Sequence, residues 1–136
     1  MSTTRDGAGR ALAGAQRVWF MDEAAFVDVR PGMRRRVVPG DGMMLCFWRI
    51  RSGTGPTPYD DHPEHEQFGV IVAGTLDFRI DGAERVRLGP GDFYWAPMGC
   101  KHGDSLFIGD PEHDDEVWIV DMFCPNREEY RPDEVR

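Results

Sequence analysis

The sequence predicts an all-β fold, either a sandwich or a barrel, and three observations lead to this prediction. From residue 18 onward the chain is a series of short apolar or alternating runs, which is typical of many short strands. Turn-forming pairs such as Pro31-Gly32 and Asp81-Gly82 separate these runs. No long stretch repeats with the helical period of about 3.6 residues. With 136 residues, the chain is long enough for one domain with its own hydrophobic core.

The expected elements lie between two tails. Residues 1–16 are rich in glycine and alanine and lack periodicity, so we expect a flexible tail followed by a folded domain over 17–124. The charged residues 125–136 are expected to pack loosely or to cap one end of a barrel. Residues 22–26 are compatible with a single helical turn. The expected strands are 18–21, 26–29, 43–50, 68–73, 76–80, 86–88, 93–95, 106–108 and 117–123.

Two local patterns are more specific. Asp81-Gly82 predicts a hairpin turn between 77–80 and 85–88, because both residues tolerate positive φ. In the run 44–50 the even-numbered residues share one face and the odd-numbered residues the other. The even face carries Trp48 and is the more apolar of the two, so we expect it to line the interior.

Composition excludes several classes of function. The formal net charge of −8 argues against nucleic acid or an anionic membrane as a partner. The basic run 34–36 is interpreted as a solvated strand edge. Three widely separated cysteines without a Cys-x-x-Cys pair indicate reduced thiols. Because the amino-terminal stretch has no apolar segment, we expect neither a signal peptide nor a membrane anchor, and we expect a cytoplasmic protein.

Histidines mark the candidate site. Three of the four histidines in the chain fall in two stretches, 60–67 and 97–102, that border apolar runs. The first stretch contains Asp60, His62, His65 and Gln67, and the second ends at His102. Imidazole, carboxylate and amide groups that converge on one point form a typical site for a divalent transition metal.

The same residues resemble the cupin superfamily. Gly91, Pro97, Gly99 and His102 reproduce the second cupin motif, Gly-(x5)-Pro-x-Gly-(x2)-His, although Leu106 stands where the family has asparagine. The first motif, His-x-His-(x3 or 4)-Glu-(x6)-Gly, is matched with two substitutions. Asp60 occupies its first histidine position and Gln67 its glutamate position, with His62 between them and Gly74 at the end.

The resemblance implies a double-stranded β-helix, or jelly-roll barrel, and a bound zinc, iron, manganese or nickel ion. It is strongest with small single-domain cupins of the pectin-degradation, sugar-ring-opening type and with certain polyketide cyclases. It also implies a homodimer, for which residues 18–21 are the expected exchanged strand.

The family spacing favours Asp60, His62, Gln67 and His102 as metal ligands. His62 and Gln67 are separated by an odd number of residues, so a break in the strand, plausibly at Pro63, must bring both to one face. His65 and Gln67 share a face without such a break. An alternative set of His65, Gln67 and His102 therefore remains open.

The sequence predicts an enzyme in which the metal acts as a Lewis acid on a small carbonyl- or enol-containing substrate, with isomerase, cyclase or lyase chemistry. His65, Glu66 and Asp121 are the candidate bases. An iron(II) dioxygenase that uses Asp60, His62 and His102 is one alternative, and a non-catalytic small-molecule-binding cupin is another. The apolar balance favours an aromatic or polyketide-like substrate over a sugar acid. The expected pocket wall consists of Met44, Trp48, Phe78, Tyr94, Trp95 and Met122.

Overall fold

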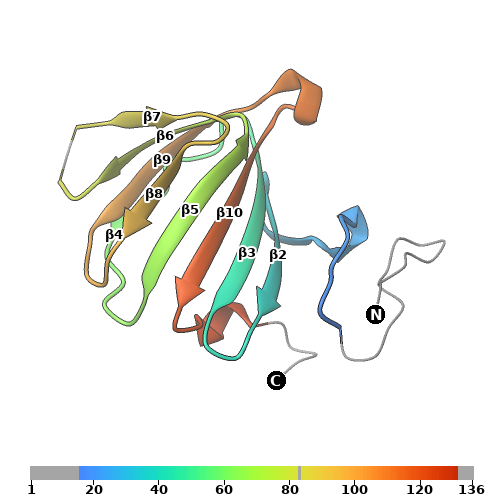
Figure 1. Cartoon of the computed structure of the whole chain (residues 1–136). Coiled ribbons are helices and arrows are strands. Elements are labelled where there is room, and N and C mark those ends of the chain that lie inside the picture. The colour runs from blue at the N-terminus through green and yellow to red at the C-terminus, as the bar shows by residue number, and fades with distance from the viewer. Residues whose placement is uncertain (1–15, 83, 132–136) are drawn as a thin grey trace.

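The protein folds into two antiparallel β-sheets that form two layers (Figure 1). The computed structural model describes residues 16–82 and 84–131, so residues 1–15 of the first expected tail and 132–136 of the second lie outside the described residues. The all-β prediction is confirmed, and the arrangement is that of a double-stranded β-helix. In chain order the elements are η1 (Glu23–Ala25), β1 (Val27–Arg30), β2 (Met33–Pro39), β3 (Met44–Arg51), β4 (Tyr59–Asp60), β5 (Glu66–Ala73), β6 (Thr75–Ile80), β7 (Val86–Leu88), β8 (Phe93–Ala96), β9 (His102–Ile108), η2 (Pro111–His113), β10 (Glu116–Cys124) and η3 (Glu128–Tyr130).

The order of the strands brings distant parts of the sequence together. The larger sheet has the order β1-β2-β3-β10-β5-β8, and the smaller sheet has the order β4-β9-β6-β7. The last strand, β10, therefore lies between β3 and β5 (Figure 1). In the smaller sheet, β4 pairs with β9 and sets Asp60 opposite His102. These two pairings position the candidate site.

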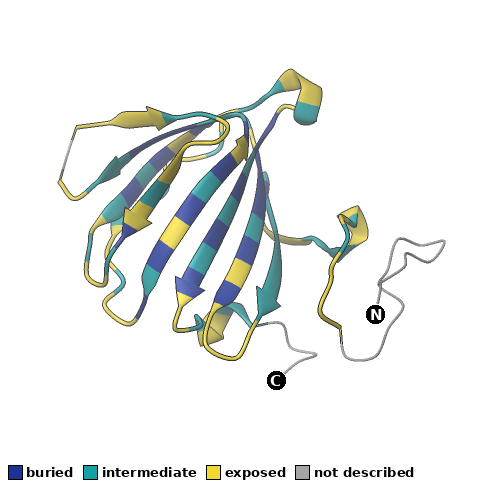
Figure 2. Cartoon of the chain, in the orientation of Figure 1, coloured by how far each residue is buried: buried dark blue, intermediate teal, exposed yellow. Residues whose placement is uncertain are grey.

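The hydrophobic core lies between the sheets. Buried and more exposed residues alternate along β5 and the first part of β3, as Figure 2 shows, because successive side chains of a strand point to opposite faces. The even-numbered face of β3, with Trp48, is buried as predicted. Met44, Phe78 and Phe123 are among the largest fully buried side chains of this core.

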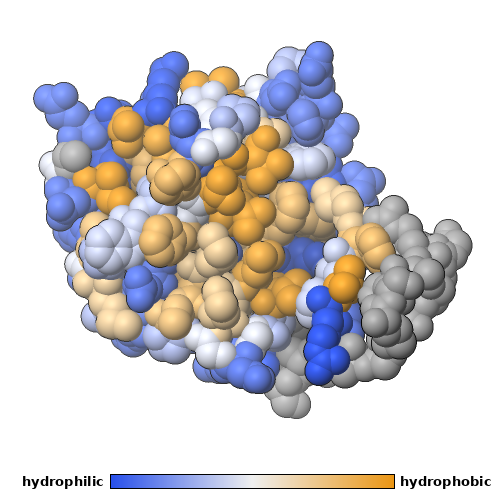
Figure 3. Space-filling model, viewed as in Figure 1, coloured by the Kyte–Doolittle hydropathy of each residue, from blue (hydrophilic) through white to orange (hydrophobic). Residues whose placement is uncertain are grey.

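The outer face of the larger sheet is also apolar. Phe68, Val72, Phe93 and Trp95 are all at least two-fifths exposed on β5 and β8. Figure 3 shows that apolar surface covers much of the side on which these strands lie. The rings of Phe68 and Trp95 stack with centroids 6.2 Å apart. The outer positions of the sheet therefore do not follow the usual pattern of a solvated face.

Three segments differ from the sequence-based expectation or refine it. Residues 18–21 form no strand, and the backbone carbonyl of Phe20 accepts from Nη1 of Arg36 at 2.9 Å. The helical turn expected over 22–26 is present as η1, and the side chain of Asp22 caps it by accepting from the backbone N–H of Ala24 at 3.1 Å. The basic run 34–36 lies in β2, between β1 and β3, and is not a strand edge.

The predicted hairpin joins β6 to β7. Asp81 and Gly82 have φ of 57° and 69°, the left-handed conformation expected for them. The backbone N–H of Gly82 donates to the hydroxyl of Tyr59 at 2.6 Å, which fixes the turn against β4. No helix in the described part of the chain is long and apolar enough to cross a membrane.

Candidate functional site

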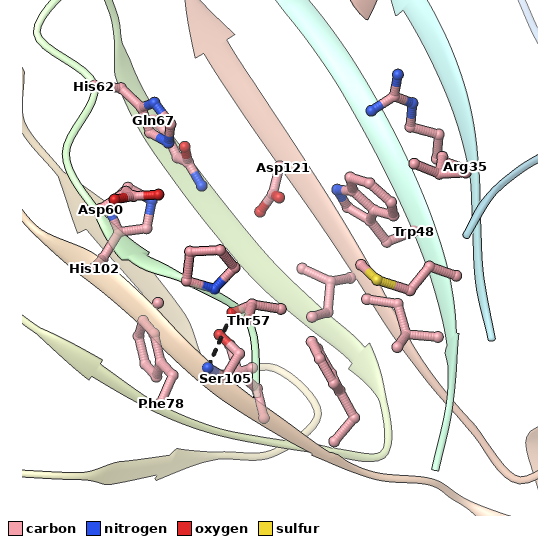
Figure 4. A pocket seen from close by; sticks show the side chains of 18 of the residues that line it. Arg35, Trp48, Thr57, Asp60, His62, Gln67, Phe78, His102, Ser105 and Asp121 are labelled. Atoms are coloured by element: carbon pink, nitrogen blue, oxygen red, sulfur yellow. Dashed lines mark hydrogen bonds between the residues drawn. The ribbon is translucent and has the colours of Figure 1, made fainter. Parts of the chain in front are cut away.

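A pocket of about 400 Å³ lies between the two sheets. Aromatic side chains such as Trp48, Phe78 and Phe123 form part of its wall. Polar side chains gather in two places that Figure 4 shows from close by. We refer to the group Asp60, His62, Gln67 and His102 as the histidine end and to the surroundings of Asp121 as the carboxylate end.

The histidine end joins the two stretches that the sequence singled out. Asp60 and His102 are opposite each other in the β4–β9 pair. Gln67 is buried on β5, with its side chain on the pocket side. The ring of His62 lies 5.5 Å from the ring of His102, measured between centroids. The fold thus places all four favoured ligand candidates around one region of the pocket.

The imidazoles at this end are held in the neutral form. Burial lowers the pKa of His102 and that of His62. Nδ1 of His102 lies 3.1 Å from the backbone carbonyl oxygen of Cys100, and a carbonyl can only accept. Nδ1 therefore carries the proton, which leaves a lone pair on Nε2. A neutral imidazole oriented in this way is the form that binds metals in proteins.

Unpartnered polar atoms test whether a metal fits here. Nε2 of His65 and Oε1 of Gln67 are buried and have no hydrogen-bond partner among the described residues. A buried polar group in that state costs about 1–3 kcal/mol unless something satisfies it. The donor types at the histidine end fit a divalent transition metal. Within residues 16–82 and 84–131, however, no three histidine, cysteine or acidic side chains are grouped tightly enough to hold an ion. The ligand set remains a prediction.

The position of His65 bears on the alternative set. Pro63 and Glu64 form a turn before β5 begins, so the expected break in the strand is present and His62 reaches the pocket together with Gln67. His65 is 5 % exposed and lies behind His62, whose ring stacks on it with centroids 5.0 Å apart. Burial lowers the pKa of His65 to about 4. Its side chain does not line the pocket, which favours the set with His62.

The carboxylate end is built around one acidic group. Asp121 of β10 is buried and lines the pocket. Burial raises its pKa to about 7, and hydrogen bonds from Tyr94 and Trp48 oppose this rise. The hydroxyl of Tyr94 donates to Oδ1 of Asp121 at 3.0 Å. A carboxyl group with a pKa near neutrality exchanges protons readily at physiological pH.

The structure corrects the role expected for Glu66. Its carboxylate accepts from the indole N–H of Trp95 at 2.9 Å on the exposed side of the sheet. The physical reason is the alternation along β5: because Gln67 points into the pocket, its neighbour Glu66 points away. Of the three candidate bases, Asp121 alone lines the pocket.

Half of the expected pocket wall is also corrected. Trp48, Phe78 and Tyr94 line the pocket. Trp95 is 52 % exposed on the outer face, since it follows the inward-facing Tyr94. The remaining two residues do not line the pocket either, because Met122 follows the inward-facing Asp121 on β10 and Met44 is enclosed in the core.

Comparisons with known proteins agree with this geometry. A family model described as the cupin domain matches residues 46–104, a range that contains both sequence motifs. The structure of KdgF from Halomonas sp. superposes with a TM-score of 0.68 at 28 % identity, over 78 % of this chain and 90 % of that one. The chain belongs to the cupin superfamily. None of the curated protein sequences matches this cupin significantly.

Other solved structures share the fold of this cupin. An RmlC-like cupin from Shewanella frigidimarina is 21 % identical with a TM-score of 0.65, over 78 % of this chain and 87 % of that one. Ectoine synthase from P. lautus is 20 % identical with a TM-score of 0.58, over 76 % of this chain and 71 % of that one. At these identities the likeness concerns the fold alone.

Among the residues of the cupin pocket that sequence reasoning missed, three form one cluster. Arg35 of β2, Arg127 and Tyr130 all line the pocket. The Tyr130 ring lies between the two guanidinium groups, with its centroid 3.9 Å from Cζ of Arg35 and 4.0 Å from Cζ of Arg127. Nη1 of Arg127 donates to the hydroxyl of Tyr130 at 2.9 Å. The sequence could have indicated only Arg35, because residues two apart on a strand share a face and Met33 of β2 is buried.

Proposed function

We propose that this cupin is a metal-dependent enzyme that moves a proton on a small substrate with a carbonyl or enol group. The observation that carries the proposal is Asp121, a pocket carboxyl group with a pKa of about 7 that lies across the pocket from neutral imidazoles. Acidic groups tuned toward neutral pH inside pockets are typical of proton-transfer enzymes.

Asp60, His62, Gln67 and His102 would hold the ion, which we expect to be zinc, iron, manganese or nickel. When bound, it supplies a Lewis acid that polarises a carbonyl group. The chain supplies the proton transfer. Because Oδ1 of Asp121 accepts from Tyr94, we assign Oδ2 as the atom that takes the proton from the substrate and returns it.

Positive charge in the pocket indicates the substrate class. Arg35 and Arg127 both line the pocket of a protein whose net charge is −8. Nε of Arg127 is buried and has no hydrogen-bond partner in the described part of the chain. A guanidinium group binds carboxylates through paired N–H donors. We therefore expect a substrate that carries a carboxylate, with the aromatic wall excluding water around it. This favours a sugar acid over the aromatic or polyketide-like substrate that the apolar balance had favoured.

Deuterium exchange tests the proposal directly. Keto acids and unsaturated uronic acids would be incubated in D₂O with protein loaded with zinc, nickel or manganese, and NMR would follow deuterium uptake next to the carbonyl. We expect uptake with the wild-type protein and a loss of about 10²–10⁴-fold in Asp121→Asn. Glu112→Gln, which changes an exposed carboxylate far from the pocket, is the matched control.

Three results would contradict the proposal. The first is that protein purified without chelator binds no divalent metal. The second is that deuterium uptake is the same in Asp121→Asn and the wild type. The third is dioxygen consumption with iron(II) in place of exchange, which would favour the dioxygenase alternative.

We also propose a homodimer, as the family resemblance implies. Residues 18–21, the expected exchanged strand, form no strand within one chain, and an exchanged strand would pair only in the second copy, so this expectation stays a prediction. The apolar outer face of the larger sheet is the surface that we expect a second copy to cover. Sedimentation equilibrium of the wild type and of Phe93→Ser tests this, because the substitution would weaken the association. A monomer at all concentrations would contradict it.

A further inference from the structure

Tyr94, Gly69 and Asp121 form one row across three neighbouring strands. Gly69 of β5 is paired with Tyr94 of β8 on one side and with Asp121 of β10 on the other. Paired residues of antiparallel strands point to the same face of the sheet. Since neighbouring strands are about 4.8 Å apart, the backbones at the two ends of the row are roughly 10 Å apart. The hydroxyl of Tyr94 nevertheless reaches Oδ1 of Asp121, at 3.0 Å.

The absence of a side chain at position 69 makes this contact possible. A Cβ atom on Gly69 would lie 2.6 Å from Oδ1 of Asp121 and would overlap with Cε1 of Tyr94. The φ of Gly69 is not among the positive values, so its backbone conformation does not require glycine. Position 69 carries glycine because the tyrosine ring crosses the strand there.

The hydrogen bonds along the row have a fixed direction. The phenol has a single proton, and it donates this proton to the carboxylate of Asp121, which can only accept when ionised. The second bond of the phenol, 2.6 Å to Nε2 of Gln67, must then have the amide as its donor. The opposite atom of that amide, Oε1, lies on the side of His62 in Figure 4. It is the buried oxygen that has no partner among the described residues.

From this we propose that Tyr94 is a positioning residue that joins the two ends of the pocket. It turns the amide oxygen of Gln67 toward the histidines while it holds the Asp121 carboxylate in place. The proposal rests on the proposed function for its chemical meaning, because Gln67 is a candidate metal ligand and Asp121 the candidate base.

The row also accounts for glutamine at position 67, where the family motif has glutamate. A glutamate there would accept only, and so would Asp121. One phenol proton cannot serve both carboxylates, and the second negative charge would repel the first. Glutamine removes this conflict because its amide nitrogen donates to the phenol oxygen.

Tyr94→Phe tests the proposal, because it removes one oxygen atom and keeps the ring. In metal-free ¹⁵N-labelled protein, the side-chain amide signals of Gln67 are assigned by their loss in Gln67→Glu. We expect Tyr94→Phe to shift these signals and to weaken Zn²⁺ binding, measured by titration calorimetry, about tenfold. Tyr130→Phe is the matched control, since it deletes a hydroxyl in the same pocket that bonds to Arg127 instead.

The outcomes separate this proposal from the proposed function. Unshifted Gln67 signals in Tyr94→Phe, or an equal shift in Tyr130→Phe, would overturn it. Unchanged Zn²⁺ affinity in Tyr94→Phe would overturn it as well. If the wild type binds no Zn²⁺ but the signals shift, the row is supported and the proposed function fails.

A second variant, Gly69→Ala, disturbs the same hydrogen bonds without removing a hydroxyl group. Gly69→Ala leaves every hydroxyl in place but puts a methyl group where the ring crosses. We expect it to shift the Gln67 signals as Tyr94→Phe does. The double variant is expected to bind Zn²⁺ no more weakly than Tyr94→Phe alone, because both changes break the same contacts. Fully additive losses would overturn the proposal.

Discussion

Two buried charged groups lie on neighbouring strands but on opposite faces of the larger sheet, and their surroundings differ completely. On the outer side, Arg49 of β3 is 1 % exposed, and every arm of its guanidinium group is paired. It donates to Glu116 at 2.8 Å, to Glu23 at 2.8 Å and to Asp114 at 2.9 Å. On the inner side, Asp121 of β10 has no cation within hydrogen-bond distance among the described residues, and burial raises its pKa.

The difference separates stability from function. The Arg49 cluster ties η1 and the loop after η2 to the sheet, so its charges are satisfied within the chain. The pocket lining instead contains buried polar atoms on Gln67 and Arg127 that find no partner in the described part of the chain, and Nε2 of His65, beside the pocket, is in the same state. Groups left in that state lower stability, and they are the groups that a ligand or an ion would satisfy.

The largest expected loss of stability follows from breaking the Arg49 cluster. Arg49→Ala leaves the buried carboxylate of Glu116 without its main partner, so we expect the free energy of unfolding to fall by about 3–5 kcal/mol. Urea unfolding measures it, and Arg51→Ala, at an exposed position of the same strand, is the control. A loss no greater than that of the control would show that the cluster does not stabilise the fold.

At high pH, Asp121→Asn is expected to raise the free energy of unfolding, in contrast to Arg49→Ala. The pKa of Asp121 in the folded protein is about 7, above its value in the unfolded chain. Its contribution to stability is therefore complete below about pH 4 and is lost as the pH rises through 7. At pH 8 we expect the variant to be more stable than the wild type by up to about 4 kcal/mol, with little difference at pH 4. Urea unfolding at the two pH values measures this, and the exposed Asp61→Asn is the control. A difference in stability between Asp121→Asn and the wild type that does not change with pH would contradict the prediction.

A divalent metal ion bound at the histidine end of the pocket is expected to stabilise the protein. At a Zn²⁺ concentration about 100 times the Kd, the free energy of unfolding rises by about 2.7 kcal/mol. His102→Ala should abolish this gain, whereas His113→Ala, on η2 beside Asp110, should keep it. Thermal unfolding with and without Zn²⁺ measures both. Equal gains in the two variants would place the metal elsewhere.

The smallest effect is expected for Glu66→Gln. Its carboxylate is on the outer face and bonds to an exposed indole, so we expect a change below about 0.5 kcal/mol in stability and none in deuterium uptake. A loss of uptake comparable to that of Asp121→Asn would mean that Glu66 reaches the substrate.

The sequence predicted the parts of the site that follow from spacing. The histidine motifs placed Asp60, His62, Gln67 and His102 in one region, and alternation placed the Trp48 face in the interior. Asp121 was one of three candidate bases. Alternation along β5 would have excluded Glu66, but the sequence did not show which face of β5 points inward.

The rest could not be predicted because it depends on pairing between strands. Nothing local in the sequence shows that Gly69 stands between Tyr94 and Asp121, since this follows from the registers of β8, β5 and β10. Arg127 and Tyr130 follow the last strand in the charged segment 125–136, for which the sequence predicted only loose packing or a cap on one end of the barrel. Arg49 also reads as a surface residue, and its burial depends on carboxylates far away in the chain.

The position of Tyr130 between Arg35 and Arg127 has a practical consequence for handling the protein. Part of the pocket wall comes from the segment after β10, because Arg127 and Tyr130 line the pocket. Shortening the chain to the end of its last strand would remove Arg127 and Tyr130 from the pocket wall and leave Arg35 with Trp48, 5.4 Å from Cζ to the ring centroid, as its aromatic neighbour. Any comparison of ligand binding between preparations therefore needs residues 125–131 intact.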